Sequence, residues 1–422
     1  MERIFDVVVI GGGASGMFAS GGAAEKGDNV LLVERGERLG RKLSITGKGR
    51  CNITNAGEIK DFIKSYGNNG KFLYRAFTEF FNQDLTTFFN QYGVRTKQER
   101  GGRIFPVSDN SQSIVNALKN YLGENKVMIK LNSRAEEIII SENKPSEKDF
   151  RKHKVDGIKL KNSAEIIKSV KVILATGGIS YPGTGSTGDG YFIAEKVGHS
   201  IVPLRPALVP LETKDIFVKS LQGLTLKNVM VTVFDNDKKI DSEFGDMLFT
   251  HFGVSGPIIL KLSGLIVDNL SRNKRVTISI NLKPALDKDK LDARLLREFK
   301  NSGIRSICNV IKNLLPRKLI PVFMKLTGIV SDKKCCQITQ SEREKIISLL
   351  TNFNLEISKP RPVEEAIITR GGVALDEINP YTMESKKVKG LYFCGEIIDI
   401  DGITGGYNLQ AAFSTAYLAA NN

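Results

Sequence analysis

Cysteine and histidine are scarce in this chain of 422 residues, which contains five cysteines and three histidines. The cysteines are scattered, form no C-x-x-C pair and lack the spacing of a metal site (Cys51, Cys308, Cys335, Cys336, Cys394). This pattern excludes the disulfide framework of a small secreted protein and a dithiol relay. We therefore expect free thiols, a reducing compartment and no bound metal.

Long apolar runs are also absent, since no stretch approaches the roughly 20 residues that a membrane-spanning helix needs. The chain opens on an apolar run, FDVVVI at 5–10, which enters a glycine turn with no signal-like region before it. We expect no leader and no membrane span. The expected location is the cytoplasm.

Arginine-rich tracts and interleaved aromatic and basic residues, with which proteins hold phosphates and stack bases, are missing as well. The formal net charge is nevertheless +15. We interpret this charge as a generally basic surface, and expect a small-molecule substrate and no nucleic-acid partner. The sequence does not indicate the oligomeric state.

The apolar runs that are present predict an α/β fold. The run 5–10 is followed by a helix-compatible stretch of small residues and a second apolar run at 30–33, which together predict a βαβ unit. Further strands are predicted at 127–131, 135–140, 155–160 and 170–174. The end of the chain returns to a strand at 391–396 and finishes in an alanine-rich helix at 405–420.

Between these ends the pattern changes twice. Proline-bearing, alternating runs after Gly190 predict antiparallel strands of a barrel or sandwich, and later residues have helical spacing broken by Pro316 and Pro321. We expect a discontinuous Rossmann-type FAD-binding domain with an inserted β-barrel and a small helical domain. The expected boundaries are 1–195 and 365–422 for the FAD-binding domain, 196–285 and 354–364 for the barrel, and 286–353 for the helical part.

The segment 11–16, GGGASG, satisfies G-x-G-x-x-G in the context of a preceding strand and a following helix. Gly11 permits the tight turn, Gly13 lets the backbone approach a pyrophosphate, and Gly16 lets the helix lie close to the strand. Glu34, at the end of the second strand, is placed to accept ribose hydroxyls. These features predict a bound dinucleotide.

Three further segments favour FAD over NAD. A glycine-rich and basic loop at 40–55 can lie along an extended cofactor, although a solvated basic surface loop is the alternative. The small residues ATGG at 175–178 let the backbone pass close to a ligand. The helix that begins after the glycines at 405–406 offers free N–H groups to a reduced flavin.

The expected cofactor-binding residues share a position in one of these segments or at a strand end. They are Gly11, Gly13, Ala14, Ser15, Gly16, Glu34, Arg35, Arg41, Lys42, Ser44, Gly47, Cys51, Asn52, Ala135, Ala175, Thr176, Gly177, Gly395, Glu396, Gly405, Gly406, Asn408 and Leu409.

The blocks GGGASGMFAS, LGRKLSITGKGRCNITN, ATGGISYPGTGSTGDGY, THFGVSGP and CGEIIDIDGITGGYNLQAAFSTA extend over nearly the whole chain. Together they resemble the BaiN-type family of NAD(P)/FAD-dependent oxidoreductases, which are also labelled aminoacetone-oxidase-like flavoproteins. The resemblance implies FAD, a reaction with NAD(P)H, an inserted β-barrel and a helical domain. The fold is similar, more distantly, to the flavoprotein subunits of fumarate reductase and succinate dehydrogenase.

Three residues are candidates for catalysis. His251 suits proton transfer near neutral pH, Tyr181 lies in a glycine-rich loop with further hydroxyls at 184–187, and Arg370 can steer an anionic substrate. A structural role is the alternative for each. The insertion contains no second G-x-G-x-x-G, so we expect NAD(P)H to be a transient reductant.

We therefore expect an FAD-dependent oxidoreductase, NAD(P)H-linked, that transfers hydride through flavin N5 to or from a small organic substrate between the Rossmann and inserted domains. Two alternatives stay open. One is a tRNA-modifying or nucleic-acid-linked flavoprotein, and the other is a flavin-binding protein without turnover.

Overall fold

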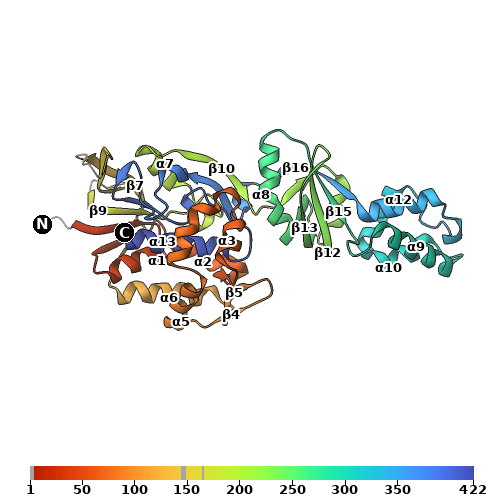
Figure 1. Cartoon of the computed structure of the whole chain (residues 1–422), viewed down its shortest axis with the longest axis horizontal. Helices are drawn as coiled ribbons and strands as arrows, with labels where there is room; N and C mark the ends of the chain where they lie inside the picture. Colours follow the sequence, from red (N-terminus) through yellow and green to blue (C-terminus); the bar gives the residue numbers. More distant parts are fainter. Residues whose placement is uncertain (1–3, 144–148, 164–165) are drawn as a thin grey trace. The chain divides into compact units, whose positions relative to one another are not determined.

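The computed structural model describes residues 4–143, 149–163 and 166–422. The chain forms two units, one made of Met1–Arg205 with Ala366–Asn422 and the other of Pro206–Glu365. Both chain ends therefore belong to the first unit (Figure 1).

The first unit is built on an eight-stranded sheet within the described residues. Its main strand order is β18-β8-β9-β1-β2-β6, while β19 pairs with β9 and β7 with β8. These strands are β1 (Ile4–Ile10), β2 (Val30–Val33), β6 (Met128–Lys130), β7 (Ala135–Glu142), β8 (His153–Leu160), β9 (Ile166–Leu174), β18 (Val388–Lys389) and β19 (Leu391–Phe393). The predicted α/β fold is confirmed.

The register of the parallel strands brings four strand ends to one edge of the sheet. Ile10 of β1 lies opposite Val33 of β2 and Leu174 of β9, and Leu174 lies opposite Phe393 of β19. The residues that follow these strands must therefore emerge side by side. In open α/β sheets this carboxyl edge is where ligands bind.

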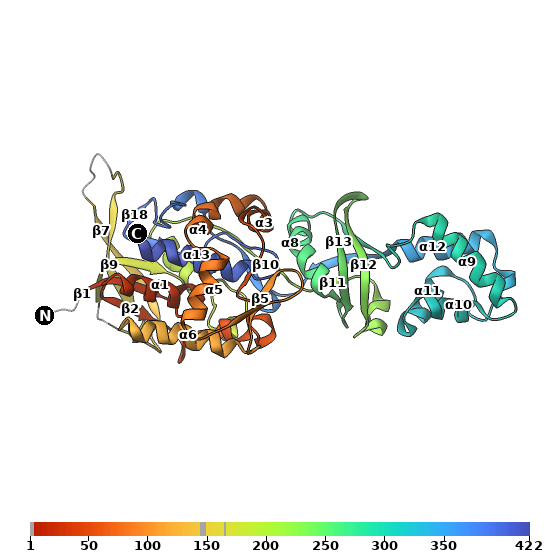
Figure 2. The same ribbon diagram turned by 60° about the horizontal axis from the view of Figure 1, so that its bottom comes forward.

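Helices from both ends of the chain pack together on this sheet. Helix α1 (Ala14–Glu25) contacts α6 (Ser111–Glu124) and the C-terminal helix α13 (Tyr407–Asn421), which lies beside it in both views (Figures 1 and 2). Phe18 of α1 forms edge contacts with Phe88 and Phe413. The C-terminal helix α13 is thus packed in the same core as the N-terminal helix α1.

Smaller elements complete the unit. A three-stranded sheet pairs β3 (Thr54–Asn55), β5 (Arg103–Pro106) and β4 (Thr96–Gln98), and β10 (Ile201–Ala207) pairs with β17 (Ile368–Val373). The remaining helices are α2 (Arg41–Ile45), α3 (Ile59–Ser65), α4 (Tyr74–Glu79), α5 (Asn82–Gln91) and α7 (Asp189–Lys196). Because β10 pairs with β17, residues 196–205 belong to the first unit, whereas the sequence places them in the insertion.

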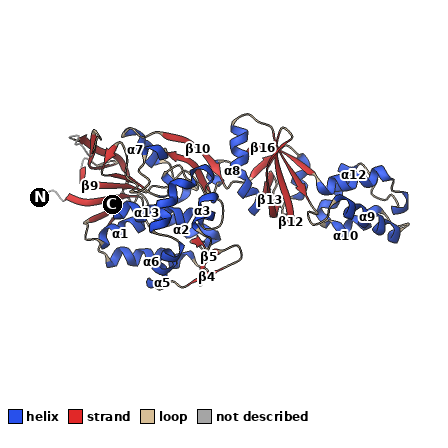
Figure 3. Cartoon of the chain, viewed as in Figure 1, coloured by secondary structure: helices blue, strands red, loops and turns tan. Residues whose placement is uncertain are grey.

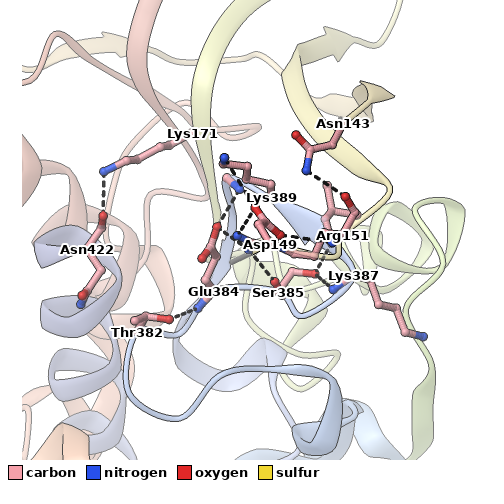
Figure 4. Close-up of polar contacts among 12 residues, drawn as sticks. Asn143, Asp149, Arg151, Lys171, Thr382, Glu384, Ser385, Lys387, Lys389 and Asn422 are labelled. Atoms are coloured by element: carbon pink, nitrogen blue, oxygen red, sulfur yellow. Dashed lines mark hydrogen bonds and ion pairs between the residues drawn. The ribbon is translucent and has the colours of Figure 1, made fainter. Parts of the chain in front are cut away.

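An ion-pair cluster fastens the returning chain to the edge of the sheet (Figure 4). Arg151 contacts Asp149 at 2.7 Å and Glu384 at 2.7 Å, and its guanidinium also donates to the carbonyl of Ser385. The hydrogen bonds from Arg151 hold the pKa of Asp149 at about 2. The cluster joins the segment before β8 to the segment before β19.

The second unit contains a closed antiparallel barrel with the order β11-β14-β13-β12-β15-β16. Figure 3 shows its strands β12, β13 and β16 in red. Its strands are β11 (Leu211–Thr213), β12 (Thr225–Asp235), β13 (Lys238–Phe249), β14 (Gly253–Ser255), β15 (Val276–Asn281) and β16 (Phe353–Pro360). Helix α8 (Pro257–Ser271) packs on it. Between β15 and β16 the chain forms α9 (Lys288–Ser302), α10 (Ile307–Leu314), α11 (Ile320–Thr327) and α12 (Gln340–Thr351).

Among the described residues, the structure contains no helix that is long and apolar enough to cross a membrane. The same part of the chain holds no cluster of three or more histidine, cysteine, aspartate or glutamate side chains arranged for a metal ion.

The packing of α13 predicts the effect of shortening Phe413. This side chain is fully buried, and its ring lies 5.4 Å from that of Phe18 and 5.7 Å from that of Phe89. We expect Phe413→Ala to lower the free energy of unfolding by about 3–5 kcal/mol, because a cavity opens in the core. Chemical unfolding followed by circular dichroism measures the change.

The control is Phe192→Ala, since the side chain of Phe192 is 67% exposed. That substitution should stay within about 0.5 kcal/mol of the wild type. Equal effects of the two substitutions would contradict the packing of α13 in the core.

Candidate functional site

A cleft opens at the carboxyl edge shared by β1, β2, β9 and β19. It contains about 1480 Å³ of space free of protein atoms, its open mouth included. Its walls come from the turn after β1, the ends of β2 and β9, the segment around α2, and the start of α13. Every lining residue belongs to the first unit.

The turn between β1 and α1 brings the backbone close to this cleft. Gly11 has a φ of +109°, and a Cβ on Gly16 would lie only 1.8 Å from the carbonyl oxygen of Gly11. A Cβ on Gly13, in contrast, would meet no atom within 4 Å. Gly11 and Gly16 are thus needed by the fold, whereas the position of Gly13 leaves open space at the cleft.

Glu34 lies at the end of β2 with its carboxylate held by backbone amides. Gly12 donates to Oε2 at 2.7 Å, and Gly36 donates to Oε1 at 2.6 Å. Each oxygen retains a further lone pair that can accept a hydrogen bond, and Glu34 lines the cleft. The carboxylate is therefore oriented in advance to accept hydroxyl donors such as those of a ribose.

The cationic side chains of the cleft divide into two groups. Arg35 and Arg134 both pair with Asp189, at 2.9 and 2.7 Å. Arg38 and Arg41 have no carboxylate partner among the described residues, although Arg41 donates to the carbonyl of Gly183 at 2.7 Å. These two guanidinium groups remain available to an anionic ligand.

A polar network lies where α2 meets the strand end after β19. Lys42 Nζ contacts Glu396 Oε2 at 2.5 Å and Ser180 Oγ at 2.6 Å. The other oxygen of Glu396 accepts from Ser180 Oγ and from the backbone N–H of Thr369, each at 2.8 Å. The network joins Lys42, Ser180 and Glu396, each of which is more than 130 residues from the other two in sequence.

The start of α13 is shaped by backbone contacts. Asn408 Oδ1 accepts from the N–H of Gly402 at 2.7 Å, and Asn408 Nδ2 donates to the carbonyl of the same residue. Gly405 accepts from Asn55 Nδ2 at 3.0 Å. Among the described residues, no side chain caps the first turn of α13 or that of α1, so their N–H groups remain available to a ligand.

Most of the predicted cofactor-binding residues line the cleft. They are Gly11, Gly13, Ala14, Ser15, Glu34, Arg35, Arg41, Lys42, Ala135, Ala175, Thr176, Gly177, Gly395, Glu396, Asn408 and Leu409. The others support the walls without lining them, namely Gly16, Ser44, Gly47, Cys51, Asn52, Gly405 and Gly406.

The segment 40–55 differs from the predicted loop, because it contains the short helix α2 and a 3₁₀ turn at Thr46–Gly49. Leu43 and Cys51 are buried, and this inward packing draws the segment into the core. Ser44 accepts through its carbonyl from Ser111 Oγ, and Asn52 Oδ1 accepts from the N–H of Ile104. These residues hold the segment in place.

None of the three catalytic candidates is among the residues that line the cleft. Arg370 forms an ion pair with Asp401 at 2.7 Å. Tyr181 has a φ of +53° and begins the turn that carries Gly183. His251 belongs to the second unit, where it is exposed in the turn between β13 and β14.

Several residues that line the cleft were not predicted from the sequence, including Arg38, Ser133, Arg134, Asp189 and Thr415. Ser133 and Arg134 directly precede Ala135, so their position next to a predicted strand end was a usable signal. No local sequence pattern predicts that Asp189 and Thr415 line the cleft. Only the packing of α7 and α13 brings them to the cleft.

The residues present fit FAD. Glu34 would hold the adenosine ribose, the space at Gly13 and the N–H groups of α1 would admit the pyrophosphate, and Arg38 and Arg41 would neutralise its charge. Thr176 lines the cleft, and its hydroxyl is buried against Gly190 without a hydrogen-bond partner among the described residues.

The contrast between Gly13 and Gly16 gives a test of this fit. We expect Gly13→Ala to weaken FAD binding at least about tenfold, because the methyl group enters space used by the pyrophosphate, while the FAD-free protein stays within about 1 kcal/mol of wild-type stability. We expect Gly16→Ala to destabilise the FAD-free protein by about 1–3 kcal/mol through overpacking. Flavin fluorescence titration and chemical unfolding measure the two effects.

If Gly13→Ala bound FAD as tightly as the wild type, the pyrophosphate would not lie at this turn. If Gly16→Ala were as stable as the wild type, the close approach of α1 and β1 would be wrong.

The thiols give a second test. Burial raises the pKa of Cys51 and of Cys394 to about 12, whereas Cys336 is exposed. Since the thiolate is the reactive species, iodoacetamide at pH 8 should modify Cys336 in the native protein and leave Cys51 and Cys394 unmodified. Mass spectrometry of digested peptides measures the labelling.

In the unfolded protein all three thiols should react, which provides the control. Labelling of Cys51 in the native state as fast as that of Cys336 would show that its segment opens to solvent.

The chain matches the HI0933-like protein Rossmann domain family over residues 5–422. It is 32% identical over 423 residues to "Ribosomal RNA dihydrouridine synthase" of Escherichia coli K12, covering 100% of this chain and 98% of the relative. It is 30% identical to "3-dehydro-bile acid delta(4,6)-reductase" of Clostridium scindens, covering 97% of each.

The structure resembles solved flavoenzymes in fold. One is 3-ketosteroid delta1-dehydrogenase from Sterolibacterium denitrificans, with a TM-score of 0.54, 13% identity and 99% of each chain covered. Another is a quinol-fumarate reductase, with a TM-score of 0.52, 13% identity, 100% of this chain and 71% of that chain covered. The resemblance predicted from the sequence is thus confirmed: the chain belongs to the HI0933-like family and is an FAD-dependent oxidoreductase.

Proposed function

We propose that this chain is an NAD(P)H-linked reductase of a carbon–carbon double bond conjugated to a carbonyl group, and that its substrate is a uracil base of ribosomal RNA. The single observation that carries the proposal is the full-length match to relatives named ribosomal RNA dihydrouridine synthase, at 32% and 29% identity. The proposed substrate corresponds to the nucleic-acid-linked alternative. From the sequence alone we expected a small-molecule substrate.

The named reactions of the relatives share one chemistry. Dihydrouridine is uridine whose ring double bond, conjugated to a carbonyl, has gained two hydrogens. A delta(4,6)-reductase of a 3-oxo compound likewise acts on double bonds conjugated to a carbonyl. The balanced reaction consumes one NAD(P)H and one proton, forms two carbon–hydrogen bonds and releases NAD(P)⁺.

FAD, when bound, supplies the two-electron chemistry that connects the nicotinamide to the double bond. The residues of the chain then bind and orient it. Glu34 would position the adenosine end of the cofactor, and Arg38 and Arg41 would position its phosphates. The N-terminus of α13 would stabilise negative charge on the flavin.

NAD(P)H as a transient donor is consistent with the sequence, because the insertion contains no second strand–G-x-G-x-x-G–helix unit. The net charge of +15 also supports a polyanionic substrate. We propose the cytoplasm as the location, since ribosomal RNA and NAD(P)H are both found there.

The experiment follows the flavin absorption band of the purified protein anaerobically after addition of NADH or NADPH, and then adds unmodified ribosomal RNA transcripts. We expect one nicotinamide to bleach the band, and RNA to restore it with formation of dihydrouridine, detected by mass spectrometry of the nucleosides. Gly13→Ala at limiting FAD is the control, since it should form less dihydrouridine.

A second candidate, a small conjugated ketone of steroid type, is favoured by the 30% identity to the bile acid reductase. Reoxidation by a 3-oxo-4,6-diene steroid, with no dihydrouridine in the RNA, would replace the proposed substrate with this one. A flavin that no nicotinamide reduces would contradict the proposed reductase.

A further inference from the structure

A stretch of the second unit carries positive charge with no acidic residue. Residues 299–331 contain no aspartate or glutamate, although the chain has 46 of them, and contain six basic residues. These are Lys300, Arg305, Lys312, Arg317, Lys318 and Lys325. The stretch covers the end of α9, all of α10 and α11, and the turns between them.

The fold places all six basic side chains on the outside. Each of the six side chains is exposed, whereas Val310 and Ile311 of α10 and Phe323 of α11 are buried. The apolar faces of α10 and α11 pack within the second unit, so the basic residues take the solvent side. The six residues are called the basic surface below.

The charges of the basic surface are not neutralised. Within the described residues none of the six forms an ion pair, and Lys318 donates to the backbone carbonyl of Gln222. Other basic residues of the second unit are neutralised by ion pairs. Arg343 of α12 pairs with Asp292, and Lys333 pairs with Glu342. Unpaired like charges repel one another, which favours a role in binding a polyanion.

We propose that the basic surface is the docking site for the phosphate backbone of RNA. This inference rests on the proposed function, because it assigns the RNA substrate a binding surface. Lys312 of α10, Lys325 of α11 and the basic residues at the end of α9 and in the turns are all exposed. A surface with several such charges suits a repeating line of phosphates, and such contacts bind without reading sequence.

A membrane surface fits these helices less well. A helix that lies on a membrane inserts its apolar face, and here that face is buried in the protein. Three large apolar side chains of the stretch are exposed, namely Ile304 at 79%, Val330 at 68% and Leu326 at 45%.

The test compares two variants of the full-length protein loaded with FAD. The first is R305Q/K312Q/R317Q/K325Q. The second is K64Q/K119Q/K154Q/K196Q, which removes the same charge from exposed lysines of the first unit. The probe is a mixed-sequence single-stranded RNA, and its affinity is measured by fluorescence anisotropy over a range of salt concentrations.

We expect the first variant to bind the RNA at least about tenfold more weakly. The slope of log affinity against log salt should fall by roughly 0.7 for each phosphate that the variant no longer neutralises. The second variant should stay within about twofold of the wild type. The unfolding midpoint and FAD content of each variant show that the fold is kept.

Equal RNA binding by the first variant and the wild type would overturn the docking site, whether or not the wild type forms dihydrouridine. Wild-type binding that the first variant loses, without any dihydrouridine, would support the docking site and contradict the proposed function. If the protein floated with phosphatidylserine vesicles and did not bind RNA, the proposed RNA docking site would be overturned in favour of a membrane-binding surface.

Discussion

The alignment of four parallel strand ends is the constraint on which the rest of the structure depends. Ile10, Val33, Leu174 and Phe393 end their strands in register, so whatever follows them shares one edge of the sheet. That edge receives a glycine turn, a carboxylate at Glu34 and the approach to α13. A ligand cleft assembled from both chain ends is the direct result.

Positive charge is used in two different ways in the two units. In the cleft most cations are partnered, as Lys42 is by Glu396 and Arg35 by Asp189, which fixes their geometry. The six cations of the basic surface form no ion pair in the described part of the chain. Partnered charges suit a defined cofactor, and unpartnered charges suit a flexible polyanion that brings its own negative charge.

Much of the lining of the cleft could be predicted because its signals are local. A strand, a glycine motif and an acidic residue at the next strand end need only neighbouring residues to be recognised, and the cleft indeed contains Gly13, Glu34 and Ala175. The catalytic candidates rest on the chemistry of their side chains and, for Tyr181, on its place in a glycine-rich loop. Arg370 forms an ion pair with Asp401, a residue that no local pattern connects to it.

The sequence by itself determined the α/β class, the dinucleotide fingerprint and the presence of an insertion, since periodicity and glycine spacing act over a few residues. Tertiary structure alone decided which side chains face the cleft. Cys51, a residue of the segment 40–55, is buried, and Ser180 and Thr369 both meet Glu396 although they come from other segments of the chain. Such contacts depend on strand register and helix packing, which no local pattern encodes.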